Sequence, residues 1–218
     1  MLSAIATKLI SYVLATACAL SFVPLATAFR SPGNNRDYEP IQPIAYSHRV
    51  HAGQLKLSCL YCHTGAETSR YAGIPTTSTC MNCHQAIRTT AAAAAQEEKA
   101  AAQEARAPNA IESPELRKLY DALALDADLM VIAGKAQKPI AWTQVHKLPD
   151  FVYFDHRAHI TAGAACQTCH GPIETMDRVR QFETLSMGWC VDCHREANEN
   201  GLNGKPVNAS IDCVTCHF

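Results

Sequence analysis

The sequence predicts a fold of short helices and coil with little sheet, arranged around bound groups instead of a large side-chain core. Three observations lead to this prediction. The pattern C-x-x-C-H occurs five times in the 218 residues and uses ten of the eleven cysteines. Four further histidines form two H-x-x-H pairs just upstream of two of these motifs. About 190 residues follow an apolar N-terminal run, which leaves roughly 40 residues per motif.

The C-x-x-C-H pattern is the attachment signature of c-type haem. Each cysteine forms a thioether with a haem vinyl group, and the adjacent histidine becomes an iron ligand. The cysteine and histidine content predicts about 0.03 copies by chance, so the repeated occurrence is decisive. We therefore expect five covalently bound c-type haems (haem c), held by Cys59, Cys62 and His63; Cys80, Cys83 and His84; Cys166, Cys169 and His170; Cys190, Cys193 and His194; and Cys213, Cys216 and His217.

Other uses of these cysteines fit less well. A disulfide framework leaves the adjacent histidines unexplained. A zinc ribbon binds each metal with four ligands and has no need of a histidine next to every C-x-x-C. A thioredoxin-like C-x-x-C needs a βαβ context that this sequence does not suggest. Only Cys18 is left over, inside the apolar run, where it is a small hydrophobic residue.

The formal net charge of −1 argues against a nucleic-acid partner. Each ferric haem with ionised propionates adds about −1, which brings the oxidised holoprotein to about −6. We therefore expect an acidic surface that suits a basic redox partner.

The N-terminal segment, residues 1–29, is expected to be a single membrane anchor. Residues 9–29 carry no charge, and as a helix they span about 31 Å, close to the thickness of the bilayer core. The alternative is a cleaved signal peptide, because Ala26-Thr27-Ala28 resembles a cleavage site. Thioether attachment of haem in bacteria takes place outside the cytoplasmic membrane. The haem-bearing body is therefore expected on the periplasmic side of the cell inner membrane.

An internal repeat organises the rest of the chain. Residues 46–63 and 154–170 both carry H-R-x-H, a short spacer with glycine, and then C-x-x-C-H. Each copy is followed by a second motif, so the chain contains two dihaem units and one further haem site. The expected segments after the anchor are a linker at 30–45, a first dihaem unit at 46–88, an Ala-rich helical insertion at 89–139 and a trihaem unit at 140–218.

The segment between the two units has a different composition. Residues 91–107 are rich in alanine and favour a helix that has almost no large apolar stripe. Ser113 and Pro114 then predict the N-cap and first position of a second, amphipathic helix. We expect an exposed helix followed by an amphipathic one; a docking arm for a partner subunit is the alternative.

Five histidines outside the motifs can supply the second iron ligands. His48 and His156 are expected to bind the iron whose motif follows them, and His51 and His159 are expected to reach neighbouring haems. His146 would then serve the fifth iron. Met187, three residues before a motif, competes with it, and methionine raises the potential of a haem relative to histidine. Trp142, Tyr153 and Phe154 are expected to pack against haem faces.

This ligand count bears on function. If every iron has two protein ligands, none has an open position for a substrate. The protein would then transfer electrons without bond chemistry at iron, and no catalytic residue is expected. A haem-based reductase would need at least one five-coordinate haem.

Two long stretches, residues 41–88 and 139–217, resemble the pentahaem cytochrome subunit of bacterial alternative complex III. The likeness includes the runs VHKLPDFVYF and LSMGWC, which are more specific than the haem motifs. Residues 89–112 look like an insertion relative to that family. The resemblance implies a multihaem cytochrome c fold of the class III or c7-like type, with coil and short helices wrapped around five haems and one N-terminal transmembrane helix.

The same resemblance implies an electron-transfer subunit of a quinol:electron acceptor oxidoreductase in a respiratory or photosynthetic chain. An iron–sulfur subunit would deliver electrons, and a monohaem cytochrome c or a blue-copper protein would accept them. Quinol would be oxidised in a partner membrane subunit, so this chain is not expected to be an enzyme on its own. The alternatives are a free-standing periplasmic electron shuttle and a haem-based reductase.

Overall fold

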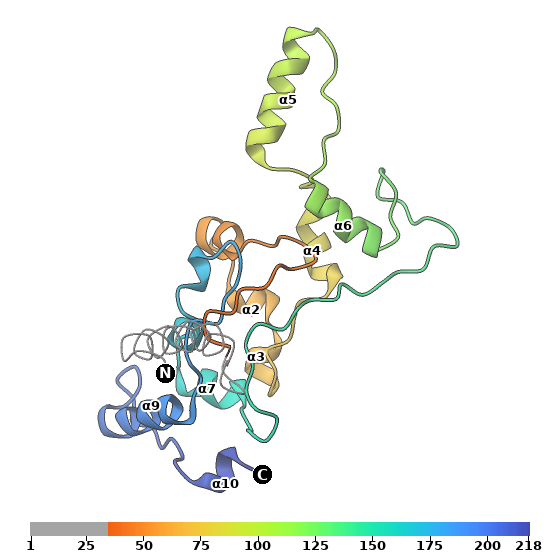
Figure 1. The fold of residues 1–218 in the computed structure, drawn as a ribbon. Helices are drawn as coiled ribbons and strands as arrows, with labels where there is room; N and C mark the ends of the chain where they lie inside the picture. The colour runs from red at the N-terminus through yellow and green to blue at the C-terminus, as the bar shows by residue number, and fades with distance from the viewer. Residues whose placement is uncertain (1–34) are drawn as a thin grey trace, which may run out of the picture.

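The computed structural model describes residues 35–218 and consists of helices and coil, as the sequence predicts. The described residues contain no strand, only three isolated β-bridges, such as the one between Val152 and His217. The helical elements, drawn in Figure 1, are η1 (Arg49–Gln54), α2 (Cys59–Cys62), α3 (Gly65–Thr68), α4 (Thr77–His84), α5 (Ala91–Gln103), α6 (Pro114–Ala122), α7 (His156–Ala162), α8 (Cys166–His170), η2 (Ile173–Thr175), α9 (Met187–Asn200) and α10 (Cys213–Cys216).

Every C-x-x-C-H motif begins or lies in a helix, namely α2, α4, α8, α9 and α10. Helical geometry puts the two cysteines of a motif, which are three residues apart, on one face. Side-chain caps start two of these helices: Ser58 accepts a hydrogen bond from the backbone N–H of Leu60, and Ser186 accepts one from Trp189. The helix therefore presents both thiols of a motif in the same direction.

The two copies of the internal repeat pack against each other reciprocally. Element η1, which precedes the first motif, contacts η2, which follows the third motif. Helix α7, which precedes the third motif, contacts α3, which follows the first. The backbone N–H of Arg49 donates to the carbonyl of Met176, and that of His156 donates to the carbonyl of Arg70. The internal repeat of the sequence thus becomes an approximate two-fold arrangement around the first and third motifs.

The body, which we define as residues 35–88 and 140–218, has a very small side-chain core. Among its residues only Ala66, Val145 and Met176 are buried apolar side chains, and Gln181 is a buried polar one. A domain of this size ordinarily buries many more large apolar residues. Such a small side-chain core is what we expect of a chain wrapped around haems.

The arm, which we define as residues 89–139, stands away from the body and contains α5 and α6 (Figure 1). Both predicted helices are present, and Ser113 caps α6 with Pro114 in its first turn, as expected. Helix α5 ends at Gln103, four residues earlier than the composition predicts. Ala105 adopts a left-handed φ of 49°, and the N–H of Arg106 turns back to the carbonyl of Ala101, so the helix cannot continue.

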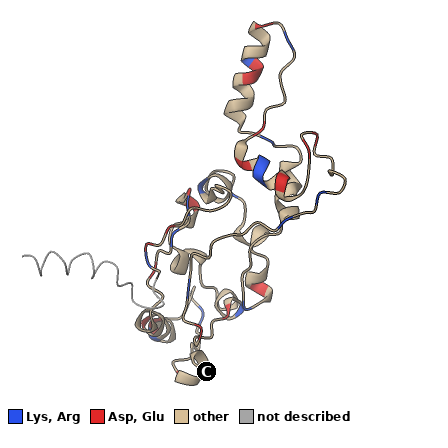
Figure 2. Cartoon of the chain, turned by 45° about the vertical axis from the view of Figure 1, so that its right-hand side comes forward, with Lys and Arg blue, Asp and Glu red and all other residues tan. Residues whose placement is uncertain are grey.

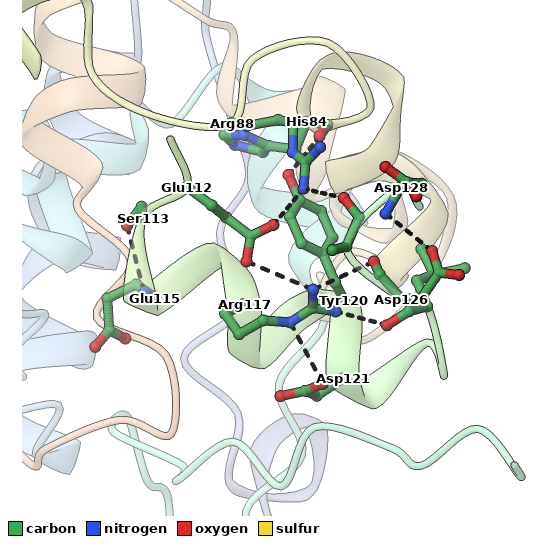
Figure 3. A network of polar contacts seen from close by, with 12 residues as sticks. His84, Arg88, Glu112, Ser113, Glu115, Arg117, Tyr120, Asp121, Asp126 and Asp128 are labelled. Atoms are coloured by element: carbon green, nitrogen blue, oxygen red, sulfur yellow. Dashed lines mark hydrogen bonds and ion pairs between the residues drawn. The ribbon is translucent and has the colours of Figure 1, made fainter. Parts of the chain in front are cut away.

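The arm has an ordinary side-chain core and a polar network around it. Leu119 is 3% exposed and Tyr120 is fully buried, and the hydroxyl of Tyr120 donates to the carbonyl of His84 at 2.6 Å. Arg88 and Arg117 lie over the Tyr120 ring, with both guanidinium groups paired to Glu112 (Figure 3). This network fixes the base of the arm against the end of α4.

No helix within residues 35–218 is long and apolar enough to cross a bilayer. The predicted anchor, residues 1–29, lies outside the described residues and stays a prediction. The division of the chain into five segments also stays a prediction. Lys and Arg are interspersed with Asp and Glu over both the arm and the body (Figure 2).

Candidate haem-binding site

Four pairs of histidine rings face each other across a gap in the body. His48 faces His63 with ring centroids 6.4 Å apart, and His156 faces His170 at 6.5 Å. The ring planes of these two pairs are nearly parallel, at 5° and 9°. The other two pairs are more twisted: His51 and His84 lie 6.1 Å apart at 63°, and His159 and His194 lie 6.0 Å apart at 38°.

These separations fit an iron atom held between two imidazoles. A metal–imidazole bond is about 2.0 Å, and the coordinating nitrogen lies about 1.1 Å from its ring centroid, so two axial rings lie about 6.2 Å apart. Each pair combines one motif histidine with one histidine of an H-x-x-H pair. The sequence predicts His63 as the partner of His48 and His170 as the partner of His156, but it names no partner for His51 or His159.

The hydrogen bonds of the rings also suit iron ligation. The Nδ1 atoms of three motif histidines lie within hydrogen-bonding distance of backbone carbonyl oxygens. The Nδ1–O distances are 2.7 Å from His63 to Gly73, 2.8 Å from His84 to Ile87 and 2.6 Å from His194 to Ser210. A proton on Nδ1 that is donated to a carbonyl leaves the lone pair of Nε2 free for a metal. Three upstream histidines have the same arrangement: His51 with Ser47 at 2.9 Å, His156 with Arg70 at 2.9 Å and His159 with Asp155 at 2.8 Å.

Burial favours the neutral imidazole that a metal requires. Burial first, and then the neighbouring His63 and His51, lowers the pKa of His48 to about 4. Burial and then His146 lower the pKa of His170 to about 3. A neutral ring keeps a lone pair for iron over the whole physiological pH range, whereas an imidazolium does not.

An aromatic ring supports each H-x-x-H pair. Tyr46 stacks on His51 with centroids 4.4 Å apart, and Phe154 stacks on His159 at 4.6 Å. The same two aromatic rings lie edge-on to His48 and His156. Phe154 was expected against a haem face, whereas Tyr46 was not singled out. The signal was present, because the two residues occupy the same position of the internal repeat, two residues before the first histidine.

Residues before each H-x-x-H pair shape the local backbone in the same way. The Ser47 hydroxyl accepts from the N–H of Val50 at 3.1 Å, and the Asp155 carboxylate accepts from the N–H of Arg157 at 2.9 Å. Asp155 also pairs with the Arg157 guanidinium, and that hydrogen bond holds its pKa at about 2. Each cap starts the turn that points both histidines of the pair toward the interior.

Thiols of different motifs influence one another. Burial first, then Cys59 and Cys83, raises the pKa of Cys62, and burial followed by Cys62 raises the pKa of Cys80. Cys59 and Cys166 share a side-chain hydrogen bond, which raises the pKa of Cys166 further after burial.

The second half of the body continues this series of thiols. Burial first, then Cys193 and Cys190, raises the pKa of Cys169 to about 11. Burial and then Cys216 raise the pKa of Cys190. These neighbour relations link the motif of Cys80 to that of Cys59, and then to those of Cys166, Cys190 and Cys213 in turn.

The remaining predicted ligands have different surroundings. His146 and His170 have ring centroids 4.4 Å apart, and Nε2 of His146 lies 3.1 Å from Nδ1 of His170, which leaves no room for iron between them. His217 faces the ring of Phe151 at 5.7 Å. Met187 is the first residue of α9, and 64% of it is exposed. The structure thus does not pair His217 with either predicted partner, and the fifth second ligand stays a prediction.

Comparison with known proteins supports this assignment of the motifs. Residues 152–218 match the family model of cytochrome c7 and related cytochrome c. The chain is also 26% identical over 196 residues to the multihaem cytochrome c subunit of a menaquinone reductase of Nitratidesulfovibrio vulgaris, a match that covers 81% of this chain and 76% of the relative.

The C-x-x-C-H motifs and these two similarities together indicate a multihaem cytochrome c, and the similarity to cytochrome c7 is confined to residues 152–218.

Proposed function

We propose that the chain binds five haems in a single row and serves as the electron-transfer subunit of a quinone-linked membrane complex. One observation carries this proposal: four pairs of histidine rings lie at the spacing expected of two imidazole ligands of one iron. Haem c supplies reversible one-electron redox chemistry when it is bound. The residues of the chain supply the iron ligands, the points of covalent attachment and the order in which the haems follow one another.

The proposed ligand pairs follow from the ring geometry. His48 and His63 hold the first iron, and His156 and His170 hold the third. The second irons of the two units are held by His51 with His84 and by His159 with His194. Each H-x-x-H pair then serves two different haems, so α7 and η1 tie neighbouring sites together rigidly. Rigid ligands limit the reorganisation that accompanies a change in iron charge.

In the proposed row the first and third motifs are at the centre, and the approximate two-fold arrangement supports this position. The Cys59–Cys166 contact joins the two units there, and the Cys80 motif forms one end. The Cys213 motif forms the other end, next to Cys190. Such a row has two termini, which is the arrangement that a subunit placed between an electron donor and an electron acceptor requires.

The identity of the complex rests on the two resemblances. The long runs shared with the pentahaem subunit of alternative complex III favour a quinol:electron acceptor oxidoreductase. In that case an iron–sulfur subunit is the donor, and a monohaem cytochrome c or a blue-copper protein is the acceptor. The relative from Nitratidesulfovibrio vulgaris is a subunit of a menaquinone reductase, which supports a second candidate with the opposite direction of flow. Both candidates place the chain beside a quinone-reactive membrane subunit.

We also propose that residues 1–29 anchor the body to the outer face of the cytoplasmic membrane. The uncharged run of residues 9–29 is long enough to span the bilayer core. N-terminal sequencing of the purified protein should find residues before Phe29. A mature chain that begins at Phe29 would instead favour the free-standing shuttle.

Affinity purification from native membranes tests the proposed complex. We expect an iron–sulfur subunit and polytopic membrane subunits to co-elute, and the complex to reduce its acceptor with added quinol. Quinone reduction by a reduced donor, without the reverse reaction, would select the menaquinone-reductase type. Elution of the cytochrome alone from well-solubilised membranes would contradict both candidates.

Substitution of a single proposed ligand tests the haem assignment. His156→Ala should leave all covalent haems attached, because attachment needs only the motif. It should convert one low-spin haem into a high-spin or water-ligated form, measured by electron paramagnetic resonance and a pyridine haemochrome assay. Arg157→Ala, at the exposed neighbouring position, is the matched control and should keep every haem low-spin. A fully low-spin spectrum of His156→Ala would show that the assignment is wrong.

A further inference from the structure

The hydrogen-bond partner of His170 differs in kind from those of the other motif histidines. His63, His84 and His194 each place Nδ1 on a backbone carbonyl. His170 instead places Nδ1 3.1 Å from Nε2 of His146, a side chain 24 positions earlier. The two rings are nearly perpendicular, at 76°, so the Nδ1–H of one ring points at the edge nitrogen of the other.

We propose that His146 is a positioning residue that accepts a hydrogen bond from His170 and thereby orients this haem ligand and strengthens its donation to iron. The proposal rests on the proposed function in one respect, namely that His170 binds iron through Nε2. Ligation through Nε2 requires the proton on Nδ1, which makes His170 the donor and Nε2 of His146 the acceptor.

The loop that carries His146 is fixed on both sides of this residue. Val145 is 8% exposed, and its carbonyl accepts from the amide Nδ2 of Asn35 at 3.2 Å. The N–H of Lys147 donates to Oε1 of Gln181 at 3.2 Å, and Gln181 is fully buried. The backbone of Gln181 is held in turn by Asp37 and Tyr38. A ring fixed in this way can hold His170 in one orientation, which a mobile side chain could not do.

The turn after His170 explains why another segment supplies the acceptor. Gly171 has a left-handed φ of 69°, and a Cβ at this position would lie 2.3 Å from Cγ of Phe182. The chain therefore turns tightly beneath Phe182 directly after the motif. After the first motif, by contrast, the chain runs on to Gly73, whose carbonyl reaches His63.

The chemistry of the acceptor determines the expected effect. An imidazole nitrogen is a stronger hydrogen-bond base than an amide carbonyl, so it draws the Nδ1 proton of His170 further away from the ring. The ring gains imidazolate character and stabilises ferric iron, which lowers the potential of that haem relative to the haem of His63. The two central sites of the row, otherwise related by the internal repeat, then have different potentials.

This role also accounts for the tenth histidine. The four facing pairs use eight of the ten histidines of the chain, which leaves His146 and His217. With Nε2 of His146 engaged by His170, the iron of His217 takes no second histidine from this chain. The fifth site therefore differs from the other four in lacking a second histidine ligand from this chain.

The test compares two substitutions in the full-length holoprotein. His146→Leu removes the group that accepts the hydrogen bond from His170. His146→Gln retains an acceptor, the oxygen of its side-chain amide. We expect both variants to keep the wild-type haem content and the wild-type number of low-spin haems. In His146→Leu one midpoint potential should shift in the positive direction while the others stay, and His146→Gln, whose amide oxygen is a weaker acceptor than imidazole, should give a smaller positive shift of the same potential. Gln144→Leu, which alters only a contact to the same loop, should leave all potentials unchanged.

A new high-spin haem in His146→Leu would overturn the proposal, because it would make His146 an iron ligand. Unchanged potentials would overturn it as well. Fewer covalent haems in the wild type, or an unaltered spin state in His156→Ala, would instead contradict the proposed function. If neither variant matures, the reduced wild-type protein labelled with ¹⁵N-histidine gives an independent measurement. Scalar coupling across the N–H···N bond between His170 and His146 supports the proposal, and its absence overturns it.

Discussion

The arm and the body of this protein are built in different ways. In the arm, Leu119, Tyr120 and Ala124 are buried at α6 and Ala101 is buried on α5, and an ion pair lies near each of the two sites. In the larger body only three apolar side chains are buried, and the interior is lined by histidine rings at iron-ligand distances. The comparison teaches that buried side chains hold the arm together, whereas the body has few of them and, on the proposed function, would have its haems as a core.

The largest effect is expected from removing a haem from the centre of the body. Cys59→Ala combined with Cys62→Ala should abolish one attachment and prevent accumulation of folded protein, because the central site supports the contacts of both units. The same pair of changes at Cys213 and Cys216 removes a site at the end of the row. That variant should accumulate with one haem fewer and with the others unchanged.

Haem content per chain and protease resistance measure these outcomes. Equal yields of the two variants would contradict the central position of the Cys59 site. Proteolysis of the unfolded central variant should spare the arm longest, since the core of the arm contains no ligand residue. Rapid cleavage within residues 114–122 would contradict the view that the arm folds on side-chain packing alone.

A change in the core of the arm should have a large local effect and none on the haems. Leu119→Ala removes a side chain that is 3% exposed, so we expect a loss of about 2–5 kcal/mol in the stability of the arm. Amide hydrogen exchange should accelerate throughout α6, while the visible spectrum stays as in the wild type. Leu116→Ala, on the same helix and only partly buried, should cost less. A shifted haem spectrum in Leu119→Ala would show that the two regions are coupled more tightly than proposed.

A smaller effect is expected at the junction of the two regions. The hydroxyl of Tyr120 donates to the carbonyl of His84 at 2.6 Å and so ties α6 to the end of α4 (Figure 3). Tyr120→Phe keeps the ring and removes this bond, which should cost about 1 kcal/mol and leave the buried carbonyl unpaired. Thermal unfolding of the arm, followed by exchange, measures the loss. Tyr120→Phe should not alter haem content, and a loss of the haem held by Cys80 and Cys83 would contradict this prediction.

Much of this architecture could be predicted from the sequence, because the signals are local. The H-x-x-H pairs lie a short loop away from their motifs, and the helix start at Ser113 and Pro114 depends on neighbouring residues alone. The environment of His146 could not be predicted, since it depends on Gln181 and Asn35, which are distant in the chain. The end of α5 was also missed, because a left-handed residue and the Arg106–Glu97 pair decide it against the helix propensity of the alanines.

The smallest effect concerns the tip of the arm and its dependence on pH. The guanidinium of Arg106 and the N–H of Asn109 both donate to the carboxylate of Glu97, and the hydrogen bond from Arg106 is the main cause that lowers the pKa of this carboxyl. A lowered folded-state pKa means that the stabilisation is present above the ordinary glutamate value of about 4.3 and is lost as the pH falls through the folded value. Amide exchange in residues 104–110, corrected for its intrinsic pH dependence, should therefore accelerate in acid more than exchange in α6 does. Glu97→Gln should make the loop exchange faster at neutral pH and remove the extra acid sensitivity, whereas Glu98→Gln, at the exposed neighbouring position, should do neither. Equal behaviour of the two variants would mean that the loop is held by the backbone turn at Ala105, and the charge pair would then contribute nothing measurable to the arm.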